Sequence, residues 1–166
     1  MVFWKKKLNW GDLMAYAEKT TVSVAKTKAD IEELIIRAGA TQFVSGFKGD
    51  AAMIGFVLGN RQIRFVLPLP DKAEKRFHFT PGQGRKRTPE AANKEWEQCC
   101  RAKWRALYLI IKAKLEAVES GISTIEREFF YDTVLPNGQT VGEYMAPQVE
   151  VAYETGEMPP LLPFFG

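Results

Sequence analysis

One long amphipathic helix constrains the fold of this 166-residue chain more than any other feature of its sequence. Thr88-Pro89 is typical of an N-cap followed by proline at the first helical position, and Gly121 is typical of a helix end. At about 100° per residue, seven side chains fall within about 100° of one another: Trp96, Cys100, Trp104, Leu107, Ile111, Leu115 and Val118. Such a stripe must pack on a sheet or on other helices. We therefore predict a helix over 89–120 that forms one side of the core.

Three antiparallel strands are predicted before this helix. The segments 42–47, 51–58 and 61–67 are rich in apolar residues and are separated by Lys48-Gly49-Asp50 and Gly59-Asn60. The Gly-Asn pair predicts a two-residue hairpin between the second and third strands.

A shorter helix is predicted over 28–38. Thr27 is the candidate N-cap, Gly39 follows as a helix end, and Ile31 and Ile35 share one face. The preceding segment, Thr20–Ala25, is β-branched and roughly alternating, so we expect an additional strand there.

The C-terminal part should add further helices. We expect one over 123–131 that starts at Ser123, and another over 140–155 that is interrupted or begins near Pro147. Residues 1–19 form an N-terminal segment that is expected to be mobile, with a short helix. Residues 20–166 are expected to form a single α+β domain, with a small antiparallel sheet of three or four strands packed against the helices at 28–38 and 89–120.

The apolar tail at 158–166 has three interpretations. It either fills a groove in the core, docks on a partner, or contacts a second subunit.

Composition excludes several classes of protein. The chain is 46% hydrophobic and 26% charged, as folded proteins are, and no apolar run approaches the roughly 18 residues of a membrane span. Met1–Lys7 is not followed by the apolar stretch of a signal peptide. The adjacent Cys99 and Cys100 have poor geometry for a disulfide and are interpreted as small apolar side chains. We expect a cytoplasmic protein of a bacterial host cell, without a cofactor.

Charge is distributed very unevenly along the chain. Residues 72–115 hold twelve basic and four acidic residues, a net charge of +8, and residues 116–166 hold one basic and nine acidic residues, a net charge of −8. Local potential, more than net charge, attracts a polyanion. The positive part is therefore a candidate nucleic-acid surface, unless the negative part packs on it in the same molecule or in a neighbouring subunit.

The segment 71–88 is predicted to be an exposed, mobile loop, which can include a short strand at 76–79. Its three cations at 85–87 precede the N-terminus of the long helix, where free N–H groups favour phosphate. Cations alternate with aromatic side chains from 75 to 79, a combination that binds single-stranded nucleic acids through phosphate contacts and base stacking. The candidate nucleic-acid-binding residues are Lys75, Arg76, Phe77, Phe79, Arg85, Lys86, Arg87, Lys94, Arg101 and Arg105.

The long helix carries a basic stripe with two interpretations. Lys94, Arg101, Arg105 and Lys112 fall within about 20° of one helical-wheel angle, which suits contact with successive phosphates. The stripe also fits a solvated helix face, because acids stand four residues from Arg101 and Lys112.

Catalytic patterns are weak. The run at 82–86 lacks the spacing of a phosphate-binding P-loop, and His78 has no evident nucleophile partner. A cluster of acids is a candidate divalent-metal site or a solvated helix face: Glu116, Glu119, Glu126, Glu128 and Asp132. We expect a non-catalytic protein.

Four segments resemble a family of small proteins encoded by phages and prophages. They are the stretch from Arg105 through Phe129, Leu135-Pro-Asn-Gly-Gln-Thr-Val-Gly142, Met158-Pro-Pro-Leu-Leu-Pro163, and Gln62-Ile-Arg-Phe65 with Leu67-Pro-Leu-Pro70. The resemblance runs from about Tyr16 to Pro163 and implies a phage or mobile-element setting. It assigns no functional residue. Small non-enzymatic proteins in that setting commonly bind nucleic acid or block a host defence system.

A second resemblance is topological. From Thr27 to Gly121, the order helix, three strands, helix is similar to that of double-stranded-RNA-binding domains. The strand predicted before it and the length of the final helix depart from that pattern.

These observations predict a phage-type nucleic-acid-binding protein with a preference for single strands and little sequence preference. The alternative is a phage-encoded protein inhibitor of a host nuclease or of an RNA-guided defence complex, acting through the acidic region or by occupying a nucleic-acid channel. A metal-dependent nuclease that uses the acidic cluster is the third candidate. Formation of a homo-oligomer is compatible with all three.

Overall fold

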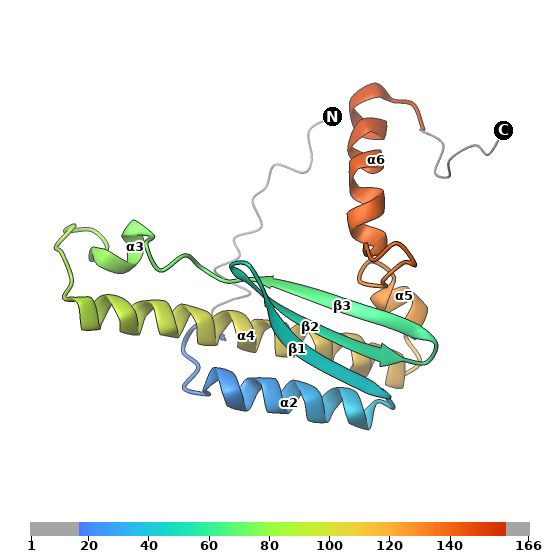
Figure 1. The fold of residues 1–166 in the computed structure, drawn as a ribbon, viewed down its shortest axis with the longest axis horizontal. Coiled ribbons are helices and arrows are strands. Elements are labelled where there is room, and N and C mark those ends of the chain that lie inside the picture. Colours follow the sequence, from blue (N-terminus) through green and yellow to red (C-terminus); the bar gives the residue numbers. More distant parts are fainter. Residues whose placement is uncertain (1–16, 159–166) are drawn as a thin grey trace.

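The computed structural model describes residues 17–158 and has an α+β fold, as predicted. Its elements follow in the order α2 (Val24–Arg37), β1 (Gln42–Lys48), β2 (Ala51–Leu58), β3 (Arg61–Pro68), α3 (Lys75–His78), α4 (Pro89–Glu119), α5 (Ile125–Phe129) and α6 (Val141–Thr155). The three strands form one antiparallel sheet in the order β1-β2-β3, and α2 and α4 lie side by side along it (Figure 1). The predictions for the N-terminal segment and the apolar tail fall largely on 1–16 and 159–166, outside the described residues.

Helix α2 begins earlier than predicted, because Ser23 and not Thr27 is its N-cap. The Ser23 hydroxyl accepts a hydrogen bond from the backbone N–H of Lys26 at 3.1 Å. Thr27 is buried and continues the face formed by Ile31 and Ile35. The strand predicted over 20–25 is therefore wrong, since these residues lead into the cap and the first turn of α2.

The sheet matches the predicted strands to within one residue. Leu58 pairs with Arg61, which leaves Gly59-Asn60 as a two-residue hairpin loop, as predicted. Gly59 has φ +59°, the left-handed region that a type II′ turn requires at this first loop position.

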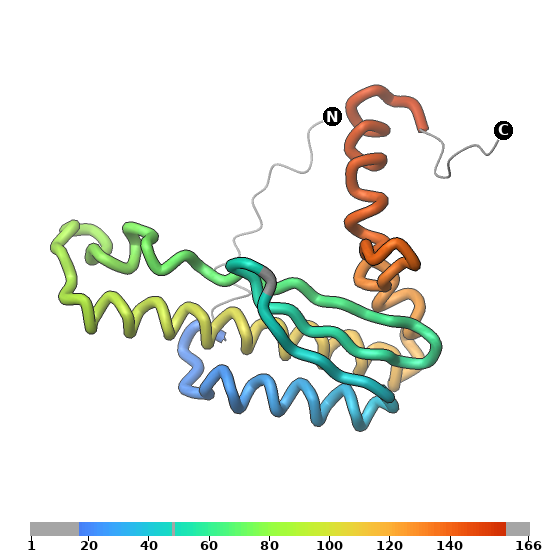
Figure 2. The backbone as a smooth tube through the Cα atoms, viewed as in Figure 1, coloured from blue at the N-terminus to red at the C-terminus, as the bar shows by residue number. Residues whose placement is uncertain are grey.

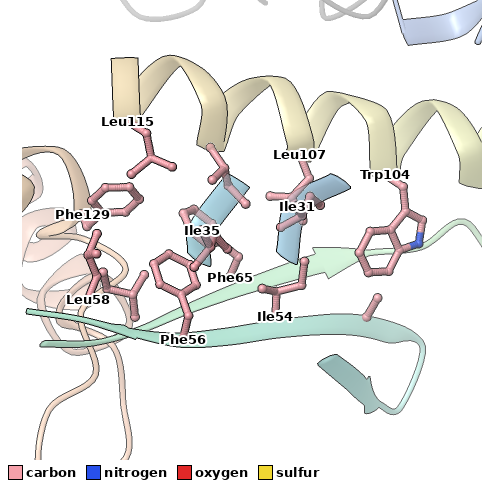
Figure 3. Close-up of a cluster of buried hydrophobic side chains, with 13 residues drawn as sticks. Ile31, Ile35, Ile54, Phe56, Leu58, Phe65, Trp104, Leu107, Leu115 and Phe129 are labelled. Atoms are coloured by element: carbon pink, nitrogen blue, oxygen red, sulfur yellow. The ribbon is translucent and has the colours of Figure 1, made fainter. Parts of the chain in front are cut away.

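The core lies between one face of the sheet and the two long helices. Figure 3 shows Ile54 and Phe56 of β2 pointing toward Leu107 and Trp104 of α4, with α2 contributing Ile31 and Ile35 from the side. Phe129 of α5 closes one end, with its ring edge-on to Phe56 at 5.9 Å and to Phe65 at 6.3 Å between centroids.

Helix α4 confirms the central prediction. The Thr88 hydroxyl accepts from the N–H of Ala91 at 3.2 Å, Pro89 is the first helical residue, and the helix runs to Glu119. Five members of the predicted stripe are buried, from Cys100 to Leu115. At the ends of the stripe, Trp96 and Val118 are half-buried, and the Trp96 indole donates to the carbonyl of Pro70 at 2.9 Å.

The C-terminal region follows the predicted order with different boundaries. Thr124, and not Ser123, caps α5. The chain then runs beside β3, where the Val134 N–H donates to the Gln62 carbonyl at 2.7 Å. Helix α6 starts at a capping box formed by Thr140 and Glu143, and it continues through Pro147 without the predicted interruption.

Helix α6 stands away from the rest of the described chain (Figure 1). Gly142 in its first turn is its one buried residue. Within residues 17–158, no helix combines the length and the apolar character needed to cross a membrane.

Candidate nucleic-acid interface

The segment between β3 and α4 has a defined fold, which we call the basic lobe and define as residues 75–87. It contains five Lys or Arg residues and no Asp or Glu. The chain leaves the sheet, forms the lobe beyond the end of β3 and turns back into α4 (Figure 2). The short strand considered over 76–79 is wrong, because residues 75–78 form the helical turn α3. Phe79 instead pairs with Lys86 in an isolated antiparallel bridge.

Arg87 holds the lobe together from inside. Its Nη1 donates to the backbone carbonyls of Arg76 at 2.9 Å, Phe77 at 3.3 Å and Phe79 at 2.6 Å. Its Nη2 lies 3.9 Å from a carboxylate oxygen of Glu95 in α4. The guanidinium thereby satisfies carbonyls at the end of α3 and ties the lobe to α4. Arg87 was predicted to contact phosphate, and the structure instead gives it internal partners.

Phe77 anchors the lobe and is not a surface residue. Its ring is buried and belongs to the contact between α3 and α4, with the Arg76 guanidinium 4.7 Å from the ring centroid. Arg76 also pairs with Glu74 at 2.6 Å. Burial leaves no open face of Phe77 on which a base could stack.

Three predicted cations remain exposed on the lobe: Lys75, Arg85 and Lys86. None of them has an ion-pair partner among residues 17–158. Phe79 is 41% exposed and stands directly opposite Lys86 in the bridge. The backbone N–H of Thr80 donates to the carbonyl of Arg85, and the backbone N–H of Arg87 donates to the carbonyl of His78. Phe79 and Lys86 are therefore a non-hydrogen-bonded pair, in which the two side chains lie close together. An exposed cation and an exposed aromatic ring therefore lie together.

The basic stripe of α4 is mostly neutralised within the chain. Arg101 donates to the side-chain oxygen of Gln98 and lies 4.0 Å from Glu97, and Lys112 lies 3.5 Å from Glu116. Arg105 lies 3.3 Å from Asp30 of α2 and its guanidinium stacks on Tyr108. These partners support the interpretation of a solvated helix face. Lys94 is exposed and has no ion-pair partner among residues 17–158.

The Arg105–Asp30 contact belongs to a small network between α2 and α4. A hydrogen bond and ion pair with Lys26, at 2.8 Å, together with Arg105, lower the pKa of Asp30, and the same contact raises the pKa of Lys26. The cations of α4 thus have partners both in α2, where Arg105 meets Asp30, and in the acidic C-terminal region, where Lys112 meets Glu116 and Lys114 meets Asp132.

The acidic residues proposed as a metal site do not come together. Within residues 17–158, no three histidine, cysteine or acidic side chains are placed to share a metal ion. Asp132 lies 3.6 Å from the Lys114 Nζ, which also donates to the Glu128 carbonyl. Burial raises the pKa of Asp132, and Lys114 opposes that rise.

The two cysteines are free thiols, as predicted. Cys100 is buried, and this burial raises the pKa of its thiol. A raised pKa keeps the thiol protonated, so Cys100 is a packing residue.

Sequence reasoning missed one contact that organises the C-terminal region. The Arg64 Nη2 lies 2.6 Å from Glu143 Oε2, and Nη1 donates to the Gly138 carbonyl at 2.9 Å. The one available signal was the arginine at an outward position of a mostly apolar β3.

Comparison with known proteins adds no assignment to this geometry. No protein-family model, no curated protein and no solved structure matches the chain.

Proposed function

We propose that this protein binds nucleic acid through the basic lobe, without catalysis, with a preference for single strands and little preference for sequence. In the phage setting that its sequence suggests, it would act in the cytoplasm of a bacterial host. The observation that carries the proposal is the preorganised lobe, in which Lys75, Arg85 and Lys86 are exposed and have no ion-pair partner within residues 17–158.

Preorganisation matters because ordering a loop on binding reduces affinity. The contacts of Arg87 and the burial of Phe77 fix the lobe before any ligand arrives. The adjacency of Phe79 and Lys86 supports the single-strand preference, since one base can stack on the ring while its phosphate meets the ammonium group. Lys94, in the second turn of α4, extends the positive surface along the helix.

Fluorescence anisotropy with labelled single- and double-stranded oligonucleotides of one length, titrated over a series of salt concentrations, tests the proposal. We expect tighter binding to single strands and an affinity that falls steeply with salt. Each phosphate-binding cation that is removed should reduce the log–log slope by about 0.7 for single strands. The triple variant Lys75→Gln, Arg85→Gln, Lys86→Gln should therefore reduce it by about 2.

A matched triple variant provides the control. Arg101→Gln, Arg105→Gln, Lys112→Gln removes the same charge from cations that already have acidic partners, so the slope should stay near that of the wild type. Equal effects of the two variants would show that binding follows net charge and would remove the assignment to the lobe.

The stacking contact has its own control. Phe79→Ala should weaken single-strand binding by about 1–3 kcal/mol without changing the salt slope. Phe47→Ala removes another exposed ring, on β1, and should have no effect. Duplex binding that equals or exceeds single-strand binding would contradict the strand preference.

A protein inhibitor of a host nuclease or RNA-guided complex is the second candidate. It is favoured by the stretch 141–158, which holds four glutamates and no Lys or Arg and includes the projecting helix α6. This function predicts a stable complex with the host protein and negligible affinity for free DNA or RNA, so the same titrations distinguish the two.

A further inference from the structure

The sheet face that points away from the core has an apolar centre, also carries Gln42, Gln62 and Arg64, and is uncovered by other elements within residues 17–158. β2 is apolar at all eight positions, whereas a strand with one solvated face normally alternates apolar and polar residues. The outward Met53 pairs with Val66 of β3, and Val44 of β1 is 64% exposed on the same face. An apolar patch of this kind at the centre of a face is typical of a sheet that is covered there by another element.

Two glycines make the centre of this face hollow. Gly46 and Gly55 lack side chains there, although the Val44 side chain lies close over Gly55, and a depression of about 260 Å³ is lined by residues of all three strands and by Val134. A Cβ added at Gly46 would meet no atom within 4 Å. The space can therefore receive a side chain from another element.

Helix α6 has an apolar side that its own chain covers in part near the start, where Val141 and Met145 are half-buried, and that is exposed farther along at Val149. On a helical wheel its apolar residues fall within about 80° of one another: Val141, Met145, Val149 and Ala152. Its glutamates lie on the opposite side: Glu143, Glu150 and Glu154. A lone 15-residue helix is marginal in water, and Pro147 removes one of its hydrogen bonds. The apolar side of α6 therefore needs a partner.

The Arg64–Glu143 pair decides which way α6 faces. Arg64 stands on the outer sheet face, in register with Gly55, and holds Glu143 at 2.6 Å. In its first turn α6 thus presents Glu143 to its own β3, and the exposed Val149 lies about 120° away from Glu143 on the helical wheel. Val134, shortly before α6, lines the hollow, so the helix starts at the rim of the uncovered face.

We propose that the chain forms a two-fold dimer in which the apolar side of each α6 packs on the uncovered sheet face of the other copy. A two-fold axis makes the exchange reciprocal, so that both sheets and both helices are covered at once. The glutamates point away from the contact, so the two like-charged helices meet without burying acidic groups.

The dimensions fit this arrangement. Helix α6 is about 22 Å long and about 10 Å across, and the strands of seven or eight residues are about 25 Å long. Two such contacts bury about 1,000 Å² in total, which is near the minimum for a biological interface and fits a weak dimer.

Sedimentation equilibrium of the full chain across the micromolar range tests the dimer. The protein is treated with nuclease and measured in high salt, so that bound nucleic acid does not bridge copies. We expect a concentration-dependent monomer–dimer equilibrium. A monomer at every concentration would overturn the proposal and would point to a different cover for the sheet.

Single substitutions then locate the interface. Gly46→Leu places a side chain in the hollow from a position whose added Cβ meets no atom within 4 Å, and Val149→Asp places a charge on the apolar side of α6, so each should abolish the dimer. Val151→Asp is the matched control, because Val151 is 45% exposed against 46% for Val149 but lies about 160° away on the wheel. Unchanged circular dichroism and melting temperature would establish that each variant is folded. A dimer that survives Gly46→Leu or Val149→Asp would contradict this interface.

Mixed cross-linking tests the exchange itself. In a Cys99→Ser, Cys100→Ala background, one protein carries Met53→Cys and a second carries Met145→Cys. Mixing the two should give a disulfide-linked heterodimer, and replacing the second by Val151→Cys should not. Equal cross-linking of both pairs would show that α6 does not lie on the sheet in the proposed orientation.

Discussion

Arg87 Nη1 lies 2.6 Å from the backbone oxygen of Phe79, and the same nitrogen reaches the carbonyls of Arg76 and Phe77. One guanidinium thus fastens both ends of a lobe whose other cations point into solvent. Arg87 is the cation nearest the N-terminus of α4, and its position in the sequence predicts a phosphate ligand. In the structure its role is instead to hold the lobe that carries the exposed cations. Because Arg87 is structural and Arg85 and Lys86 are exposed, substitutions of these neighbouring cations should have different effects.

Substitution of Arg87 should loosen the lobe even where charge is kept. Arg87→Ala removes charge-assisted hydrogen bonds, of the kind worth about 1.5–3 kcal/mol, that the two N–H groups of Nη1 share among three carbonyls, and Arg87→Lys cannot reproduce the planar fork. Both variants should accelerate amide exchange at residues 79–84, measured by mass spectrometry. Arg85→Ala, which removes an exposed neighbour, should leave exchange unchanged. Normal protection in Arg87→Lys would show that charge alone holds the lobe.

The aromatic cluster at the end of the core should dominate stability. Phe129 is fully buried against Phe56 and Phe65, so Phe129→Ala should lower the free energy of unfolding by about 3–5 kcal/mol. The adjacent Phe130 is 63% exposed, and Phe130→Ala should change stability by less than about 0.5 kcal/mol. Urea unfolding of the two variants measures both values. Similar losses would contradict the placement of α5.

Asp132 should make stability fall as pH rises. Its pKa in the folded chain is raised by burial above the ordinary value of 3.8, so the folded state binds the proton more tightly than the unfolded state. The contribution of Asp132 to the free energy of unfolding is then greatest below pH 3.8, and it is lost as pH rises through the folded pKa. Asp132→Asn should remove this decline, as followed by urea unfolding at a series of pH values. Lys114→Met removes the opposing cation and should extend the decline to higher pH.

Asp30 should have the opposite effect, so that its contribution to stability falls as pH falls. Lys26 and Arg105 lower its pKa, so its ion pairs contribute stability above the ordinary value of 3.8 that is lost as pH falls through the folded pKa. Asp30→Asn should lower stability at neutral pH by up to about 1 kcal/mol, as expected for partly exposed pairs. It should also flatten the acid limb of the stability curve. An unchanged limb would show that the α2–α4 network contributes no net stability.

The sequence alone determined the elements whose signals are local. Caps, turns and amphipathic stripes depend on residues a few positions apart, which is why Thr88-Pro89, Gly59-Asn60 and the stripe of α4 predicted the observed elements. The same local rules predicted the wrong start for α2, because Ser23 and Thr27 are both residue types that cap helices. In the fold Thr27 is buried on the core side of α2, and Ser23 is the N-cap.

The tertiary structure decided the role of each charged and aromatic side chain, since their partners are distant in the sequence. Arg105 meets Asp30 across 75 residues and Arg64 meets Glu143 across 79. Local spacing indicated the acidic partners of Arg101 and Lys112, but no local pattern shows that Arg105 meets Asp30 or that Arg64 meets Glu143. The opposite charges of the two halves could be counted in the sequence. Only the structure showed that the positive segment keeps Lys75, Arg85 and Lys86 exposed on the lobe. It also showed that α6, in the negative segment, stands apart from the lobe.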